Sequence, residues 1–117
     1  MLFRSVLEAM KRALAHRGPD DAGTWLEEAG GIGLVHTRLA VIDLSMAGHQ
    51  PMVSDCGRYV ITYNGEIYNY RQLRRDLEGL GEHFSSNSDT EVLLKLLRRH
   101  GRAGLPRLVG KIGRAHV

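Results

Sequence analysis

The sequence contains very little cysteine, few aromatic residues and no long apolar run, and each shortage excludes a class of protein. Of 117 residues, one is Cys and 6% are aromatic. The single Cys56 cannot form an internal disulfide, which excludes a disulfide-stapled secreted domain and favours a reducing compartment. No apolar run approaches the roughly 18 residues that a membrane-spanning helix needs. We therefore expect one ordinary domain in the cytoplasm.

Excess charge is also missing from the body of the chain, although the whole sequence has a net charge of +3. Arg4, Lys111 and Arg114 account for this surplus, since residues 6–110 hold equal numbers of basic and acidic side chains. A nucleic-acid binder shows a basic stripe with interleaved aromatic residues, and none remains here. We expect neither a nucleic-acid partner nor a membrane partner.

Three segments have the apolar spacing of amphipathic helices. Residues 6–15 form the first, and residues 70–80 form the second, with Gly81 suited to a left-handed cap. Residues 88–100 form the third, which Ser88 begins with the Ser-x-x-Glu spacing of a capping box. The apolar face of the first helix is predicted to consist of Val6, Leu7, Met10 and Leu14.

The segments between the helices are rich in β-branched and aromatic residues. Residues 24–26 and 32–39 are predicted strands joined by a turn at Gly30 and Gly31. Residues 58–63 form another predicted strand, and the Asn-Gly pair that follows at 64 and 65 is typical of a tight turn with positive φ angles. Helices and strands do not alternate strictly, so the order predicts an α+β fold.

Three polar segments, at residues 36–39, 63–66 and 88–90, lie where strands end, turns form or helices start. Such positions hold side chains and backbone N–H groups rigidly toward a ligand. A small zwitterion needs a cation for its carboxylate, an acid for its ammonium and donors for a developing oxyanion. Arg38, Asp89 and the Asn64–Gly65 pair supply these groups, and Arg meets a carboxylate with two parallel hydrogen bonds.

Each of these residues also has a plain structural interpretation when taken alone. Arg38 is typical of a surface salt bridge, Asp89 of a helix N-terminal charge, and Asn64–Gly65 of a hairpin turn. Cys56 lies in a polar turn and is expected to be an incidental loop cysteine. The remaining candidates, which lack metal-ligand spacing and are expected at loops or helix ends, are His36, His49, His83 and His100.

Five motifs, taken in order, change that balance: HRGPDDAG (16–23), HTRLAVIDLS (36–45), GHQPM (48–52), YNGEIYNY (63–70) and SDTEVLL (88–94). In order and spacing they resemble the N-terminal class II glutamine amidotransferase domain of glutamine-hydrolysing asparagine synthetases. The resemblance covers residues 6–110. It implies an α+β N-terminal-nucleophile hydrolase fold, a four-layer αββα sandwich that is incomplete here, with its first strand and later strands missing.

The resemblance also implies roles for individual residues. Arg38 is expected to bind the carboxylate of L-glutamine and Asp89 its amino group, while Asn64 and Gly65 form the oxyanion hole with Glu66 alongside. The remaining lining residues are expected to be Leu39, Ala40, Val41 and Ile42. The segment holding His16, Arg17 and Asp20 is expected to order a loop.

The family's nucleophile is a Cys at the mature N-terminus, whose own α-amine acts as general base. This sequence begins Met-Leu-Phe-Arg-Ser instead, so we expect the chain itself to be inactive. Residues 1–5 and 111–117 are expected to be non-native. The codons that would encode KIGRAHV resemble a sequencing adapter, and the reverse complement of that adapter would encode MLFRS. A truncated gene with drifted ends is the alternative.

The intact parent is expected to be a cytoplasmic ligase of amino-acid biosynthesis, an asparagine synthase that passes ammonia from glutamine to aspartate. Its missing C-terminal synthetase domain would use Mg-ATP, whereas this fragment is expected to need no cofactor and no metal. A homodimeric parent is one option. Two alternatives remain open: a non-catalytic glutamine-binding module, and a related amidotransferase with another acceptor.

Overall fold

The structure is a computed structural model that describes residues 2–38 and 48–112. Its elements are α1 (Leu2–Leu14), η1 (Ala15–Arg17), β1 (Asp21–Glu27), β2 (Ile32–Arg38), β3 (Met52–Val53), β4 (Val60–Ile61), β5 (Gly65–Ile67), α2 (Tyr70–Gly79), α3 (Asp89–His100), η3 (Gly101–Arg107) and β6 (Gly110–Ile112). This mixture of helices and strands agrees with the predicted α+β class. None of the helices in these ranges has the length and apolar character that a bilayer crossing requires.

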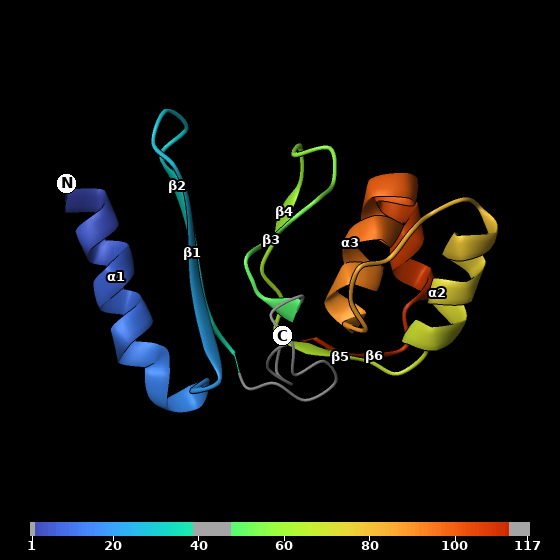
Figure 1. Ribbon diagram of the computed structural model, residues 1–117, viewed down its shortest axis with the longest axis horizontal. Coiled ribbons are helices and arrows are strands. Elements are labelled where there is room, and N and C mark those ends of the chain that lie inside the picture. The colour runs from blue at the N-terminus through green and yellow to red at the C-terminus, as the bar shows by residue number, and fades with distance from the viewer. Residues whose placement is uncertain (1, 39–47, 113–117) are drawn as a thin grey trace.

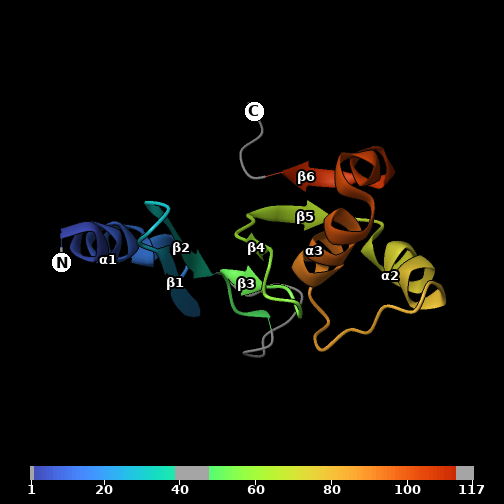
Figure 2. The ribbon, with the colours of Figure 1, turned by 90° about the horizontal axis from the view of Figure 1, so that it is seen from above.

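The elements follow one another along the longest axis of the molecule (Figure 1). Helix α1 lies at one end, next to the β1–β2 hairpin, and the β3–β4 pair separates that hairpin from α3 and α2. Three two-stranded antiparallel sheets are described, β1 with β2, β3 with β4 and β5 with β6. Seen from above, β5 and β6 run beside α3 (Figure 2). The described parts of the polar segments predicted for the site lie at the end of β2, at the start of β5 and at the start of α3.

The first predicted helix and hairpin both form, but most of the helix's apolar face is not covered. β1 pairs with β2 from Asp21 with Arg38 to Glu27 with Ile32. Leu7 is buried against this hairpin, where a side chain at Gly33 would collide with it. Val6 is 54% exposed and Met10 49% exposed. A hairpin two strands wide covers only a narrow strip of a helix, so Leu7 alone of the four predicted apolar positions is buried.

The main core lies between β5 and the helices α2 and α3. It consists of Ile67, Leu73, Leu77, Val92, Leu93 and Leu96. Leu77, Val92 and Leu96 are almost completely removed from solvent. Helix α2 ends as predicted, since Gly81 has a φ angle of 98° and donates its N–H to the carbonyl of Glu78. The two predicted C-terminal helices therefore supply most of the buried apolar surface.

The start of α3 is held by the hydroxyl group of Ser88 and the carboxylate of Glu91. The Oγ atom of Ser88 accepts a hydrogen bond from the Thr90 N–H at 3.0 Å, which is the predicted cap. The capping-box pattern predicts that Glu91 accepts a hydrogen bond from the Ser88 N–H, but that N–H donates to the Ser86 Oγ. The Glu91 carboxylate instead accepts hydrogen bonds from the N–H and hydroxyl groups of Ser85 and Ser86. Glu91 thus fixes the loop that leads into α3.

The strand predicted over residues 58–63 is confirmed in part, since Val60 and Ile61 pair with β3, and it is shorter than predicted. The turn predicted at residues 64 and 65 is wrong. The Asn64–Gly65 pair does not form a turn with positive φ angles, since the positive φ angles of the described residues belong to Gly31, Gly57, Gly81 and Gly101. Gly65 instead begins β5. Its sequence signal was that of a turn, but pairing with β6 extends the backbone.

Both ends of the described chain contribute backbone to these elements. Helix α1 begins at Leu2, and β6 pairs Lys111 with Glu66 and Ile112 with Gly65. Residues 111 and 112, which belong to the segment expected to be non-native, are therefore paired in a strand. Strand pairing uses main-chain N–H and C=O groups, which any residue except proline supplies. The proposed origin of these ends stays a prediction.

Candidate functional site

Asp89 is the buried acid at the first position of α3, and it faces the strand that follows Asn64. Its Oδ2 atom accepts a hydrogen bond from the Ile67 N–H at 3.0 Å, and only 6% of the residue is exposed. Burial raises the pKa of Asp89, helped by the charge of Glu66 and opposed by the hydrogen bond from Ile67. A carboxylate held in this way is stabilised in its charged form by a ligand cation.

Tyr63 and Glu66 share this region with Asp89. Burial, followed by the negative charges of Asp89 and Glu66, raises the pKa of Tyr63 to about 12. The phenol therefore stays protonated at neutral pH and offers an O–H donor. Two carboxylates and a half-buried phenol lie near the segment that contains Asn64 and Gly65, which leaves the region suited to a cationic group.

Gln50 joins the two sides of this region through its side-chain amide. Its Oε1 atom accepts a hydrogen bond from the Tyr63 N–H at 2.6 Å, and its Nε2 donates to the Thr90 Oγ1 at 3.1 Å. Only 6% of Gln50 is exposed. The backbone before Asn64 is thereby tied to the residue after Asp89.

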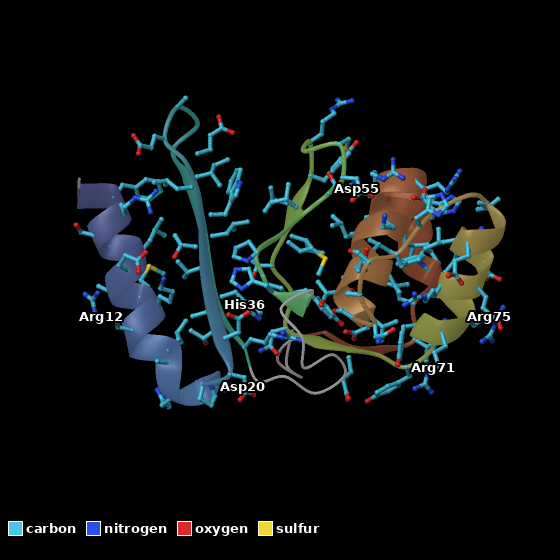
Figure 3. The ribbon with its side chains drawn as sticks, in the orientation of Figure 1. Arg12, Asp20, His36, Asp55, Arg71 and Arg75 are labelled. Atoms are coloured by element: carbon cyan, nitrogen blue, oxygen red, sulfur yellow. The ribbon has the colours of Figure 1, made fainter. Side chains whose placement is uncertain are left out.

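The end of β2 reaches the same segment through His36. The Nδ1 atom of His36 lies 2.9 Å from the Oγ1 of Thr62, the residue before Tyr63. Figure 3 shows His36 on the side of the hairpin that faces β3 and β4. Burial and the nearby charge of Arg38 lower the pKa of His36. His36 was predicted to lie at a loop or helix end, and this prediction is wrong because it lies in strand β2.

Arg38 ends β2 and is buried, with 9% of the residue exposed. Its guanidinium packs so closely on the backbone of Gly48 that a side chain there would collide with it. Its carbonyl accepts a hydrogen bond from the Asp20 N–H at 2.9 Å. The loop containing Asp20 therefore orders the backbone of Arg38, which matches the expected structural role. Because Arg38 is buried, it is not the surface salt-bridge residue that its plain structural interpretation predicts.

His49 and Gly23 bring the segment before β3 onto the hairpin. The Nδ1 atom of His49 lies 2.5 Å from the Oδ2 of Asp21. A side chain at Gly23 would collide with the Gln50 carbonyl and the His49 ring, so this approach requires glycine. These contacts fix the backbone position of Gln50.

The structure thus brings Glu66 and Asp89 close together, and Asp89 binds the N–H of Ile67, two residues after Gly65. His36, which lies near Arg38 at the end of β2, contacts Thr62, two residues before Asn64. Asn64 and Glu66 are exposed, whereas Gly65 is half-buried. The predicted lining residues Leu39, Ala40, Val41 and Ile42 lie outside the described residues.

Sequence reasoning missed Gln50 and Tyr63 as members of this site. The available signal for Gln50 was the GHQPM motif, which the sequence analysis used only for the family resemblance. Its partners lie 13 and 40 residues away in sequence, and no local pattern connects them.

Cys56 lies in the exposed turn between β3 and β4. Its Sγ is 3.3 Å from the Ser54 Oγ, and that hydrogen bond is the largest of the influences that lower the pKa of the thiol. Beside this turn, a pocket of about 180 Å³ opens between the β3–β4 hairpin and α3. The predicted site residues do not line it. Its polar lining, with Lys95 paired to Asp55, belongs to the packing of that hairpin.

Within residues 2–38 and 48–112, no cluster of three or more His, Cys, Asp or Glu side chains is placed to hold a metal ion.

The sequence profile of the glutamine amidotransferase domain matches residues 3–113. The chain is 40% identical over 105 residues to asparagine synthetase [glutamine-hydrolyzing] 1 of Bacillus subtilis, which covers 90% of the chain. It is 45% identical over 94 residues to a probable asparagine synthetase [glutamine-hydrolyzing] of Schizosaccharomyces pombe, covering 80% of the chain. It is also 36% identical over 105 residues to amidase chry2 of Gibberella zeae, again covering 90%. The chain spans 16% of the length of each of these curated relatives.

Proposed function

The chain belongs to the glutamine amidotransferase domain family, and we propose that it carries the part of the glutamine site that binds the substrate as a zwitterion. The observation that supports this proposal is the junction at Asp89. A buried carboxylate at a helix start accepts the Ile67 N–H and lies beside Glu66. Such a group suits an ammonium ion, because a ligand cation offsets the burial that disfavours its charged form.

The remaining substrate groups have candidate partners nearby. We assign the carboxylate of L-glutamine to Arg38, whose planar guanidinium forms two parallel hydrogen bonds with such a group. We assign the oxyanion to the Asn64 amide and the Gly65 N–H, and two such donors typically contribute roughly 3–4 kcal/mol each to the transition state. Glu66 lies alongside, and residues 39–42 are proposed to line the remaining surface.

In the complete domain, the proposed reaction begins at an N-terminal cysteine that is not among the residues of this chain. Its thiolate attacks the side-chain carbonyl carbon of glutamine, and the carbonyl oxygen becomes an oxyanion held by Asn64 and Gly65. The C–N bond then breaks and ammonia leaves with the proton taken by the α-amine. Water hydrolyses the thioester and releases glutamate.

We propose that the parent protein is a glutamine-hydrolysing asparagine synthetase. Its relatives of that name support this assignment, and the chain corresponds to a small share of their length. A C-terminal domain would then use Mg-ATP to activate aspartate and receive the ammonia, and a homodimeric cytoplasmic parent is compatible with the family. The segment described here is proposed to need no metal or cofactor of its own.

We further propose that residues 6–110 form part of a four-layer αββα sandwich of the N-terminal-nucleophile hydrolase type. The order of α1, the β1–β2 hairpin, the β3–β4 pair and the helices α2 and α3 along the long axis supports this arrangement (Figure 1).

The experiment that tests the substrate assignments extends the chain with a family-like N-terminal segment headed by Met-Cys and measures glutamate release. Arg38→Ala and Asp89→Ala are expected to abolish turnover, whereas the matched controls Arg12→Ala and Asp76→Ala, at exposed helical positions, are expected to retain it. Unchanged glutamine dependence in the Arg38 or Asp89 variant would contradict the assignment.

The 117-residue chain itself is expected to release no glutamate. Its one cysteine lies in an exposed turn, where its Sγ contacts the Ser54 hydroxyl. Turnover that disappears in Cys56→Ser would show that this expectation is wrong.

A second candidate is an amidotransferase that transfers ammonia to another acceptor. The match to amidase chry2 over the same length as the match to an asparagine synthetase favours keeping it. The acceptor is chosen outside the glutaminase segment, so acceptor assays of the parent protein separate the two. A non-catalytic glutamine-binding module is the third candidate, and it predicts that the extended chain binds glutamine without turnover.

A further inference from the structure

Three hydrogen bonds and two short chain segments form a closed ring that includes the proposed oxyanion donors. Five residues make or connect these hydrogen bonds. They are Gln50, Tyr63, Ile67, Asp89 and Thr90. Gln50 binds the Tyr63 N–H and the Thr90 hydroxyl, and Asp89 binds the Ile67 N–H. The segment 64–66 is therefore anchored at both ends to the first turn of α3.

The direction of the Gln50 amide follows from its partners. The Tyr63 N–H can only donate, so it must face the Oε1 of Gln50. The Nε2 group then faces the Thr90 hydroxyl, whose oxygen accepts. The oxygen and the nitrogen of the Gln50 amide therefore each have a hydrogen-bond partner, and only 6% of the residue is exposed. Neither a carboxylate nor an apolar side chain offers the same donor and acceptor pair.

The backbone of Gln50 is fixed independently of that amide. Its carbonyl lies against Gly23 of β1, where any side chain would collide with it. The neighbouring His49 is held by Asp21 at 2.5 Å. Gln50 thus connects the β1–β2 hairpin, the segment before Asn64 and the start of α3.

From this geometry we infer that Gln50 is a positioning residue of the glutamine site. It sets the distance between the oxyanion donors at Asn64 and Gly65 and the ammonium-binding Asp89. The inference rests on the proposed function, because it assumes that these groups bind opposite ends of one L-glutamine molecule. A ligand that must contact both groups is sensitive to small changes in their separation.

The test is calorimetric titration of L-glutamine into the 117-residue chain and its variants, with the folded fraction of each variant measured by circular dichroism. Gln50→Met removes both hydrogen bonds and is expected to weaken binding by about 10- to 100-fold. The control Gln72→Met makes the same change at an exposed position of α2 and is expected to leave the Kd unchanged.

Two further variants keep the inference testable when Gln50→Met does not fold. Thr90→Val removes the hydroxyl partner at nearly constant volume. It is expected to weaken binding by itself and, where Gln50→Met folds, to combine with it non-additively, as residues of one network do. Gln50→Glu keeps the acceptor for the Tyr63 N–H but adds a negative charge next to the Asp89 region. It is expected to move the pH dependence of glutamine binding to higher pH, because a nearby negative charge disfavours the ionised form of Asp89.

The outcomes separate the inference from its premise. Binding by the unchanged chain, with a weakened Kd in the folded Gln50 and Thr90 variants, supports both. Binding by the unchanged chain with equal Kd values and equal pH profiles in the folded variants overturns the role of Gln50 alone. No glutamine binding by the folded unchanged chain overturns the substrate assignments, and the inference with them.

Discussion

The two ends of the molecule treat the same amphipathic pattern differently. Helices α2 and α3 bury most of their apolar side chains, and Leu77 and Leu96 are almost completely inaccessible, although Leu80 at the end of α2 is 51% exposed. Helix α1 has an equally regular apolar face, yet Leu7 is buried while Leu14 is 39% exposed. The difference lies in what each helix packs against. Helical spacing predicts the face that can be buried, and only the neighbouring elements decide how much of that face is covered.

Leu96→Ala is expected to have the largest effect on stability. Its side chain lies in the centre of the α2–α3 core with no exposed surface. Removing it leaves a cavity that close neighbours cannot fill, and we expect the free energy of unfolding to fall by roughly 3–5 kcal/mol. Urea unfolding monitored by circular dichroism measures the change. A loss below about 1 kcal/mol would mean that this core is not the stabilising centre.

Leu7→Ala is the same substitution at the other end of the molecule and is expected to cost less. Leu7 is 5% exposed but packs on a two-stranded hairpin at Gly33. Fewer neighbours lose contacts, so we expect a loss of about 2 kcal/mol. Amide hydrogen exchange should show faster exchange in β1 and β2 before it changes in α3. Equal effects of Leu7→Ala and Leu96→Ala would remove the contrast between the two ends.

Acidification is expected to weaken the hairpin side before the helical side. The pKa of His36 is lowered from 6.5 by burial and Arg38, so its contribution is complete above pH 6.5 and is lost as the pH falls through the folded-state value. Burial opposes ionisation of Glu82, but its hydrogen bonds and charge pairing with Arg98 and Arg99 outweigh this and lower its pKa below 4.5. The contribution of Glu82 is therefore kept to more acid pH.

The measurement is the stability of the unchanged chain and of His36→Gln between pH 7 and pH 5. The variant is expected to lose the pH dependence in that interval, since Gln does not titrate. An unchanged pH profile would show that another group causes the dependence.

Leu14→Ala is expected to have the smallest effect. The side chain lies at the end of α1 and is 39% exposed, and Ala keeps the helix propensity. We expect a change within about 0.5 kcal/mol, as for most exposed positions. A loss well above that value, or one that depends on protein concentration, would show that the apolar stripe of α1 is covered in solution.

The features that the sequence predicted are those whose signal is local. Ser88 caps α3, Gly81 ends α2, and the segment 28–31 turns between two strands of high β propensity. The short strands β3, β5 and β6 were not predicted, because they are only two or three residues long, and β5 and β6 pair with each other across a long stretch of sequence. Asn64–Gly65 was misassigned for the same reason.

The candidate site divides in the same way. Asp89 and Arg38 were named from motifs, and the structure gives both of them buried positions. The residue that connects their surroundings, Gln50, acts through Tyr63 and Thr90, and a single sequence does not contain these long-range contacts. The role of each residue in binding glutamine stays a prediction until the binding experiments are done.

The turn that holds Cys56 has a consequence for chemical probes. This residue is the sole thiol of the chain, it is exposed, and the hydrogen bond with Ser54 helps it to ionise. Electrophilic glutamine analogues, which are designed to alkylate a catalytic cysteine, will therefore label this protein at one position outside the proposed substrate site. Such labelling will not be competed by L-glutamine, and the same thiol gives a single attachment point for a fluorophore on the β3–β4 turn.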